Sequence, residues 1–363
     1  MKRKWSLRLG AAVLCAVLLG SCGSTAAAPA ESTAPADPLT GQQLLYPEQR
    51  AAAVVIENTT DSTTQWGIGS ASVVLEAAAR ADTAPSLCLV YPSVSAMPTV
   101  GPVTLGQDLF WRLLSGQQVL PIQRGCDLYT RNFLDYWNLR AVDALETGRN
   151  AFTTGNTDWA SPLWCTNGQS VAKVLSSLSL SSALSEDPAG SADSTQKGDT
   201  PAVPTVPALL PQQTDGHLPD ADVADAVQAA VQFPSGSTTR FAYDTDTGTY
   251  GMLHHDGSPQ LDANTGIQAA FDNLLVLYSA STPRDDGRTL DYDLTMGGGL
   301  WLNGGHLWHI TWTQGTGSTF AFYDADGRPL RILSGRSYIA WLSSLTGEEV
   351  TVQDSAGNDL LQP

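Results

Sequence analysis

Residues 52–56, Ala-Ala-Val-Val-Ile, form the first β-rich run of the chain, and the fold can be worked out from them in both directions. Residues 87–91, Leu-Cys-Leu-Val-Tyr, are apolar without alternation, which is typical of a buried strand. Residues 119–123 have the β-rich character again. These three runs predict strands in the first half of the chain.

Helix-like runs alternate with these strands. The predicted helices cover residues 71–81, 105–114, 128–137 and 170–178. Ser70 is placed to cap the first of them. Strands that alternate with helices predict an α/β domain with a mixed sheet over residues 38–178.

The second half of the chain, residues 220–363, favours β-structure. Residues 240–248 and 319–327 resemble each other, since each runs from an aromatic strand into an Asp/Gly turn, and each predicts a hairpin. A third hairpin is predicted around Asn303-Gly304-Gly305. Further predicted elements are a strand at 273–279 and a short helix at 222–231. The expected fold class is therefore α+β, with an N-terminal α/β domain followed by a mainly β C-terminal domain.

Two segments of different composition flank the predicted domains. Residues 179–219 are rich in Ser, Ala, Pro, Asp and Thr, which predicts a low-complexity linker or a long insertion. Residues 23–37 have no periodic apolar pattern and predict a disordered tether.

The N-terminus has the features of an export signal. Four cations among the first eight residues precede a short apolar run, which is well below the ~20 residues that span a bilayer. Leu19-Gly20-Ser21-Cys22 resembles the lipobox of bacterial lipoproteins, in which the Cys is diacylated and becomes the mature N-terminus. We therefore expect residues 1–22 to be a lipoprotein signal, with a lipid on Cys22 that holds the chain on the outer face of the cytoplasmic membrane. Ordinary secretion, with cleavage after residues 26–28, is the alternative.

The chain is strongly acidic. It has 36 Asp and Glu against 19 Lys and Arg, a formal net charge of −17. Such a surface repels nucleic acid and anionic wall polymers. We expect the membrane as a partner through the N-terminal lipid, a cell-wall component or another envelope protein as a further partner, and no nucleic acid.

Cysteine and histidine spacing predicts neither a disulfide framework nor a metal site. Besides the signal and lipobox cysteines, the chain has Cys88, Cys126 and Cys165, so at most one disulfide can form. His306 and His309 fall on opposite faces of a predicted strand, which argues against a shared metal. We expect no metal and no cofactor.

Two local patterns each have two interpretations. Trp308 and Trp312 share one face of a predicted strand, which either packs in a core or stacks a sugar ring. Asp244 and Asp246 are spaced like the start of a calcium loop, but His255 stands where that loop needs Glu. A polar hairpin turn is predicted there.

Several short stretches together resemble the YerB-like lipoprotein family, the domain of unknown function 3048. In chain order they are residues 38–41, 54–58, 67–76, 100–103, 249–251, 262–266, 297–304 and 322–327. The resemblance covers both predicted domains and leaves out the signal, the tether and the linker. It implies a fold and an extracytoplasmic location, and no reaction, because the family has no settled activity.

The chain departs from the family pattern at polar positions. Thr104-Leu105-Gly106-Gln107 stands where the family has Arg-Ser-Ala-Arg, and residues 160–166 keep Thr166 without the family's His-Asn pair. Two arginines can hold an anionic group, and a His supplies acid–base chemistry near neutral pH. The resemblance therefore implies that most of this polar set is lost.

The polar groups that remain define a candidate site without an assigned catalytic residue. The candidate ligand-binding residues are Glu57, Asn58, Glu76, Gly101, Pro102, Asp127, Thr166 and Asn167. Capping or turn roles would also explain them. The first hypothesis is a non-catalytic, lipid-anchored binding or accessory factor of the cell envelope. The alternatives are an enzyme that acts on a wall polymer or peptide through Glu57, Glu76 or Asp127, at the ends of N-domain elements where α/β sites usually lie, and a solute-capture protein.

Overall fold

The computed structural model describes residues 35–59, 64–146, 148–155, 163–185, 205–216, 218–315 and 319–361. The predicted signal, the lipidation site Cys22 and residues 23–34 of the tether lie outside these ranges. From Pro35 onward the described residues form one compact unit. No helix among them is long and apolar enough to cross a bilayer.

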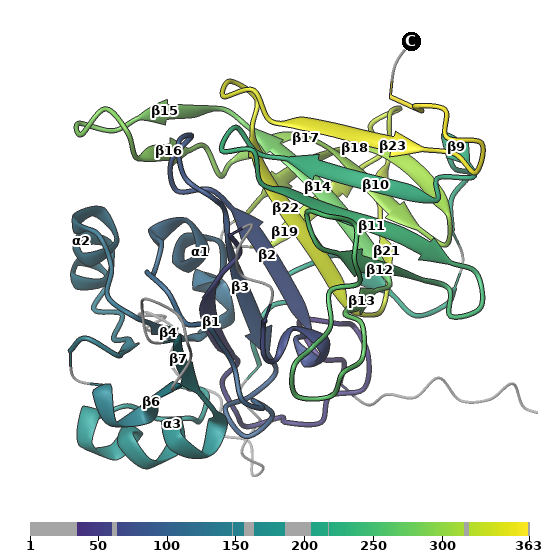
Figure 1. Cartoon of the computed structure of the whole chain (residues 1–363). Coiled ribbons are helices and arrows are strands. Elements are labelled where there is room, and N and C mark those ends of the chain that lie inside the picture. Colours follow the sequence, from purple (N-terminus) through teal and green to yellow (C-terminus); the bar gives the residue numbers. More distant parts are fainter. Residues whose placement is uncertain are drawn as a thin grey trace, which may run out of the picture. The chain divides into compact units, whose positions relative to one another are not determined.

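A mixed sheet, with twelve strands in the described part of the chain, runs through this unit (Figure 1). In spatial order its strands are β20 (Pro329–Leu330), β19 (Phe320–Tyr323), β18 (His306–Gln314), β17 (Met296–Asn303), β14 (Asn273–Ser279), β22 (Ser337–Ser343), β2 (Val73–Ala77), β3 (Ser86–Tyr91), β1 (Ala52–Glu57), β4 (Leu120–Gln123) and β5 (Val142–Asp143). The short β9 (Val223–Ala224) also pairs with β18.

Strand directions place several carboxyl ends at one edge of this sheet. β1 pairs with β4 in parallel, and β22 pairs in parallel with both β2 and β14. β3 lies antiparallel between β1 and β2, so these two strands share one direction. Polar groups at the ends of β4, β1, β2 and β22 are thereby brought to the same edge.

A second, antiparallel sheet and three short strand pairs complete the β-structure. The second sheet contains β13 (Ala270–Phe271), β12 (Thr249–Leu253), β11 (Thr238–Asp244), β10 (Gln228–Gln232) and β23 (Glu349–Gln353). The pairs are β15 (Ser281–Pro283) with β16 (Leu290–Tyr292), β8 (Gln212–Gln213) with β21 (Ile332–Leu333), and β6 (Phe152–Gly155) with β7 (Leu163–Thr166).

The helices are few and short. The α-helices are α1 (Asp108–Leu113), α2 (Leu128–Tyr136) and α3 (Gly168–Leu175), and the 3-10 turns are η1 (Ile68–Ser70), η2 (Ser115–Gln117), η3 (Arg149–Ala151) and η4 (Ser176–Leu178). Three of the four helices predicted for the first half of the chain are confirmed. Strands dominate, and the α+β class with a mixed sheet holds.

Each face of the main sheet has its own core. On one face, Val54 and Val74 pack in a cluster that includes residues of the second sheet and α3. On the other face, Trp308 and Trp312 pack with α1 and are at most 2% exposed. Both tryptophans are core residues, so the sugar-stacking interpretation is wrong. Cys88 is fully buried in the same cluster, and none of the described cysteines forms a disulfide.

The predicted helix at 71–81 is wrong, and with it the capping role of Ser70. Residues Val73–Ala77 form β2, paired on both sides with β3 and β22, and all five are buried. A short apolar run fits a buried strand as well as a helix, and the β-branched pair Val73-Val74 together with two partner strands favours the strand.

The predicted helix at 222–231 is also wrong, because β9 and β10 lie there. Asp225, between them, has a φ of 70°, a left-handed conformation that interrupts a helix. The three predicted hairpins and the strand at 273–279 are confirmed. In the Asp244 turn the Asp246 amide donates to the Asp244 side chain over 2.9 Å, as expected for a hairpin turn.

The predicted linker, residues 179–219, is packed against the body where it is described. Leu209 and Leu210 are buried in the Trp-containing core, and β8 pairs with β21. The division into domains at 38–178 and 220–363 stays a prediction. The main sheet joins strands from both ranges, since β2 pairs with β22.

Candidate functional site

The carboxyl ends of β1 and β2 bring five of the predicted residues together. Glu57 ends β1 and is followed by Asn58, and Glu76 lies near the end of β2. Gly101 and Pro102 run beside the end of β1, where the Pro102 carbonyl accepts from the Glu57 amide over 2.9 Å. Five of the eight candidate residues therefore lie in one cluster, and their role in ligand binding stays a prediction.

Glu76 is a carboxyl group in the interior of the protein. In the sheet register it lies between Leu87 of β3 and Ala340 of β22, and none of its surface is exposed. Its side chain shares the face of Val74, because side chains alternate along a strand. It is therefore directed into the layer between the two sheets.

Three donors from distant parts of the chain satisfy this carboxylate. Asn58 Nδ2 donates to Oε1 over 2.5 Å, and Thr239 Oγ1 on β11 donates to the same oxygen over 2.8 Å. The Tyr338 hydroxyl on β22 donates to Oε2. A buried charge is tolerated only with such partners, so the network fixes β1, β2, β11 and β22 around one group.

Burial raises the pKa of Glu76 to about 7, while the hydrogen bonds from Thr239 and Asn58 lower it. A carboxyl group with a pKa near neutrality is suited to acid–base chemistry. A general acid or base must also reach the proton that it transfers, and Glu76 has no exposed surface. The described geometry encloses the group rather than presenting it.

A small polar pocket lies on the solvent side of this network. Its wall includes Asn58 and Thr239, two donors to Glu76, together with His254, His255 and Gln260. Burial lowers the pKa of His254, so this imidazole is held neutral at a lower pH than usual. Glu76 lies directly behind the pocket wall.

Glu57 belongs to a second, more open group. Burial raises its pKa, and the positive charge of Arg124 lowers it. Arg124 follows β4, the parallel neighbour of β1, and its amide donates to the Thr104 carbonyl over 2.8 Å. The two side chains thus stand at the carboxyl ends of adjacent parallel strands.

Two arginines contact the ring of Trp164 on β7. The guanidinium carbon of Arg149, in η3, is 4.3 Å from the ring centroid, and that of Arg124 is 5.7 Å from it. Arg124 Nε and Trp164 Nε1 are both buried without a hydrogen-bond partner in the described structure. This is a cationic and aromatic surface that the residue pattern did not predict.

Gly101 packs closely against β7 and pairs with Trp66. The Gly101–Pro102 peptide is cis, and the Gly101 backbone exchanges hydrogen bonds with Trp66 of 2.8 and 3.3 Å. A Cβ atom on Gly101 would stand 2.7 Å from Cys165 Sγ and 2.8 Å from the Trp164 carbonyl. Only glycine fits there without a shift of β7.

Asp127, Thr166 and Asn167 have structural partners. Asp127 caps α2 by accepting from the Thr130 amide, and Asn167 caps α3 by accepting from the Ser170 amide. The Thr166 hydroxyl is buried and donates to the Ala151 carbonyl over 2.8 Å. A role of these three residues in ligand binding stays a prediction.

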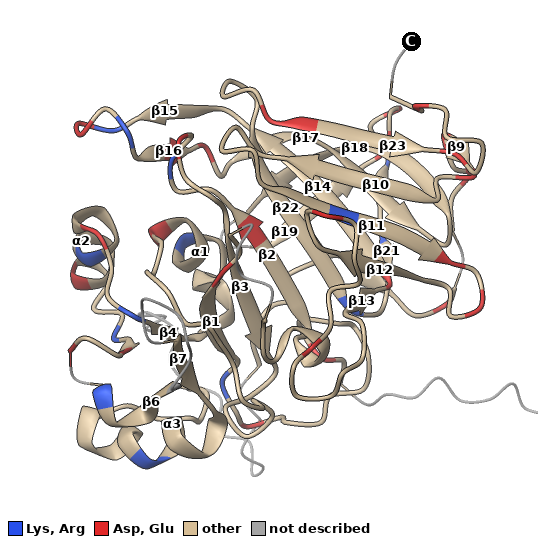
Figure 2. Cartoon of the chain, viewed as in Figure 1, with Lys and Arg blue, Asp and Glu red and all other residues tan. Residues whose placement is uncertain are grey.

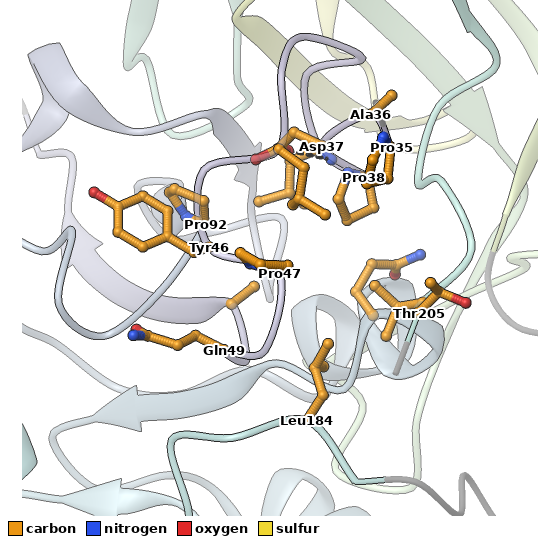
Figure 3. A pocket seen from close by; sticks show the side chains of 15 residues that line it. Pro35, Ala36, Asp37, Pro38, Tyr46, Pro47, Gln49, Pro92, Leu184 and Thr205 are labelled. Atoms are coloured by element: carbon orange, nitrogen blue, oxygen red, sulfur yellow. Dashed lines mark hydrogen bonds between the residues drawn. The ribbon is translucent and has the colours of Figure 1, made fainter. Parts of the chain in front are cut away.

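A separate, mostly apolar pocket lies where the described chain begins (Figure 3). Its lining includes Pro35, Pro38, Tyr46, Pro47 and Leu184. Asp37, also in the lining, is 6% exposed and accepts from the amides of its own turn. The pocket lacks convergent polar groups, so the strand-end cluster is the better candidate site.

The site contains residues that the sequence pattern did not point to. They are Gln65, Arg124, Arg149, Thr239 and Tyr338. Arg124 follows a predicted strand and could have been chosen by the strand-end rule. Thr239 and Tyr338 lie 163 and 262 residues from Glu76 in sequence, and no local signal marks them.

Comparisons with known proteins place this α+β body, with its mixed main sheet, in a family. Residues 39–181 match the N-terminal domain, and residues 229–339 the C-terminal domain, of the proteins of unknown function DUF3048. The chain belongs to the DUF3048 family.

Two similar proteins come from Bacillus subtilis. "Putative lipoprotein YerB" of strain 168 is 26% identical over 358 residues, which are 96% of this chain and 98% of that protein. A crystal structure of the YerB protein superposes with a TM-score of 0.70 at 19% identity, covering 87% of this chain and 99% of that one. The structural likeness supports the fold.

Proposed function

We propose that this chain is a lipid-anchored, extracytoplasmic binding or accessory factor of the cell envelope without catalytic activity. The lipobox-like Leu19–Cys22 and the likeness to a protein named as a lipoprotein support the anchor. Two acyl chains hold a protein stably at a membrane, where one does not. The binding partner is a cell-wall component or another envelope protein.

The observation that carries the non-catalytic part is the enclosure of Glu76. This carboxyl group has the pKa best suited to acid–base work in the site, yet it is fully buried and three side chains donate to it. A substrate would have to open a network that joins both sheets. The more open group of Glu57, Arg124, Arg149 and Trp164 offers charge and an aromatic face, which are means of binding.

Fractionation of cells that express the full chain tests the anchor. We expect the wild type in the membrane fraction with incorporated labelled palmitate, and Cys22→Ala without label and released from the membrane. Unlabelled wild-type protein in the culture medium would contradict the anchor and favour ordinary secretion.

Co-sedimentation tests binding. The 35–363 fragment, which begins where the compact unit begins, is mixed with purified bacterial sacculi before and after removal of anionic wall polymers. We expect retention, and stronger retention on stripped sacculi, because the fragment, with 15 Lys and Arg against 35 Asp and Glu, carries a net charge of −20. No retention on either material would contradict wall binding and direct the search to a protein partner.

A further inference from the structure

We propose that Arg124, Arg149 and Trp164 form a binding site for a carboxylate group. The inference rests on the proposed binding function and names the chemistry of the ligand at that surface. It follows from three observations: unpaired donors, a shared aromatic ring and the charge around them.

The Arg124 guanidinium lacks an acceptor. Its Nε is buried, and none of its nitrogens forms a hydrogen bond or ion pair with a described residue. Arginine stays charged at any physiological pH and carries five N–H donors in a rigid fork. A buried N–H such as Nε is normally paired, and the two other guanidinium nitrogens are not buried, so an acceptor from outside the chain can approach the group.

Trp164 supplies a second unpaired donor at the same place. Its indole Nε1 is buried and also has no acceptor among the described residues, while its ring contacts both guanidinium groups. Arg149 is exposed, and the hydrogen bond that its Nη1 donates to the Phe152 carbonyl is long, at 3.3 Å. The guanidinium nitrogens that are not buried are therefore open to a ligand group, beside the Trp164 ring that contacts both arginines.

The charge balance selects an anion. Acidic positions dominate the chain, as the red turns near β9 and β11 show in Figure 2, yet here two cations lie against one ring. Like charges so placed repel, and since Glu57 forms no ion pair with Arg124, a further negative group beside the arginines lowers that cost. Arginine binds planar carboxylates bidentately.

Glu57, which ends β1 beside Arg124 at the end of β4, disfavours a doubly charged anion. Its carboxyl group is close enough for Arg124 to lower its pKa, although no ion pair within 4.0 Å joins them. A phosphate, with up to two negative charges, would be repelled more strongly by Glu57 than a carboxylate. The structure therefore favours a peptide-type carboxylate over a phosphate.

Titration of the ¹⁵N-labelled 35–363 fragment followed by NMR tests the site. N-acetylalanine is the probe, N-acetylalanine amide and inorganic phosphate are the comparisons, and Trp164→Phe assigns the Trp164 indole signal. We expect N-acetylalanine to shift that signal in a saturable manner, the amide to leave it unchanged, and phosphate to bind more weakly. Arg149→Ala and Arg124→Ala should each weaken binding about tenfold, the loss of one charged hydrogen-bond partner.

Arg331→Ala is the matched control, since it removes the same charge from an exposed position on the C-terminal part. Unchanged binding is expected. An absent shift, an equal shift with the amide, tighter binding of phosphate, or equal weakening by Arg331→Ala would each overturn the carboxylate site and leave the arginines as stacking partners of Trp164.

Sacculus retention of the same variants separates this inference from the proposed function. If sacculi retain the wild type and Arg149→Ala equally well, the carboxylate site is not the wall contact. The proposed binding function would then still stand. A carboxylate titration that succeeds with a fragment that sacculi do not retain would support the site and contradict wall binding.

Discussion

The Thr239 hydroxyl on β11 donates to Oε1 of Glu76 on β2 over 2.8 Å, and so fastens the second sheet to the main sheet at a fully buried carboxyl group. The two residues are 163 positions apart in sequence. Glu76 also receives the hydroxyl of Tyr338 on β22, so the carboxyl group joins strands from both family-matched regions. This single group ties the candidate site to the stability of the fold.

Thr239→Val should lower the free energy of unfolding by about 1–2 kcal/mol, because it keeps the shape of the side chain and removes one donor to a buried carboxylate. Urea denaturation at pH 7.5 measures this. Thr351→Val, at an exposed position on β23 of the same sheet, should change stability by less than about 0.5 kcal/mol. Equal effects of the two variants would show that the Thr239 contact contributes nothing specific.

Glu76→Gln should change the pH dependence of stability. The pKa of Glu76 rises from 4.5 to about 7 on folding, so between these pH values the folded chain holds a proton that the unfolded chain has lost. The stability of the wild type relative to Glu76→Gln should therefore be greatest below pH 4.5 and fall by about 3 kcal/mol as the pH rises through 7. Denaturation of both proteins from pH 4.5 to pH 8 tests this, and a difference that stays flat would refute the raised pKa.

Gly101→Ala should destabilise the protein by about 1–3 kcal/mol, because its Cβ would stand 2.7 Å from Cys165 Sγ and 2.8 Å from a backbone carbonyl. Gly298→Ala is the control on β17, where the only atom near a Cβ is 4.0 Å away. Thermal unfolding compares the two. A melting temperature for Gly101→Ala equal to that of the control would mean that β7 moves aside at no cost.

Asp127→Ala should cost about 1 kcal/mol of stability through the lost cap of α2 and leave sacculus retention unchanged. Asp135→Ala removes an equal charge from an exposed position within the same helix and should be close to neutral. If Asp127→Ala is as stable as the wild type but sacculi retain it less, Asp127 takes part in binding.

The sequence predicted the strands well where the signal was local. Residues 52–56 and 273–279 are strands, and the turn at Asn303-Gly304-Gly305 joins β17 to β18. The run at 71–81 failed, because Val73–Ala77 becomes a central strand through pairing with β22, more than 250 residues away. Tertiary pairing overrides propensity in such short apolar segments.

The candidate site was predicted in part for the same reason. Glu57 and Glu76 could be chosen because α/β sites usually lie at the ends of such elements, although Glu76 was expected on a helix and lies on β2. The burial of Glu76 could not be predicted, because Thr239 and Tyr338 reach it from the other half of the chain. Asp127 was chosen by the same rule and Asn167 as a polar group near the family's missing arginines, and both cap helices in the structure.

Non-catalytic binding is tested most directly by incubating purified sacculi with the 35–363 fragment. The material that the sacculi release is then analysed by chromatography. We predict that the fragment sediments with the sacculi and that no new wall fragments appear in the supernatant. New fragments that Glu76→Gln or Glu57→Gln abolishes would contradict this and show that the enclosed carboxyl group, or its neighbour, performs chemistry.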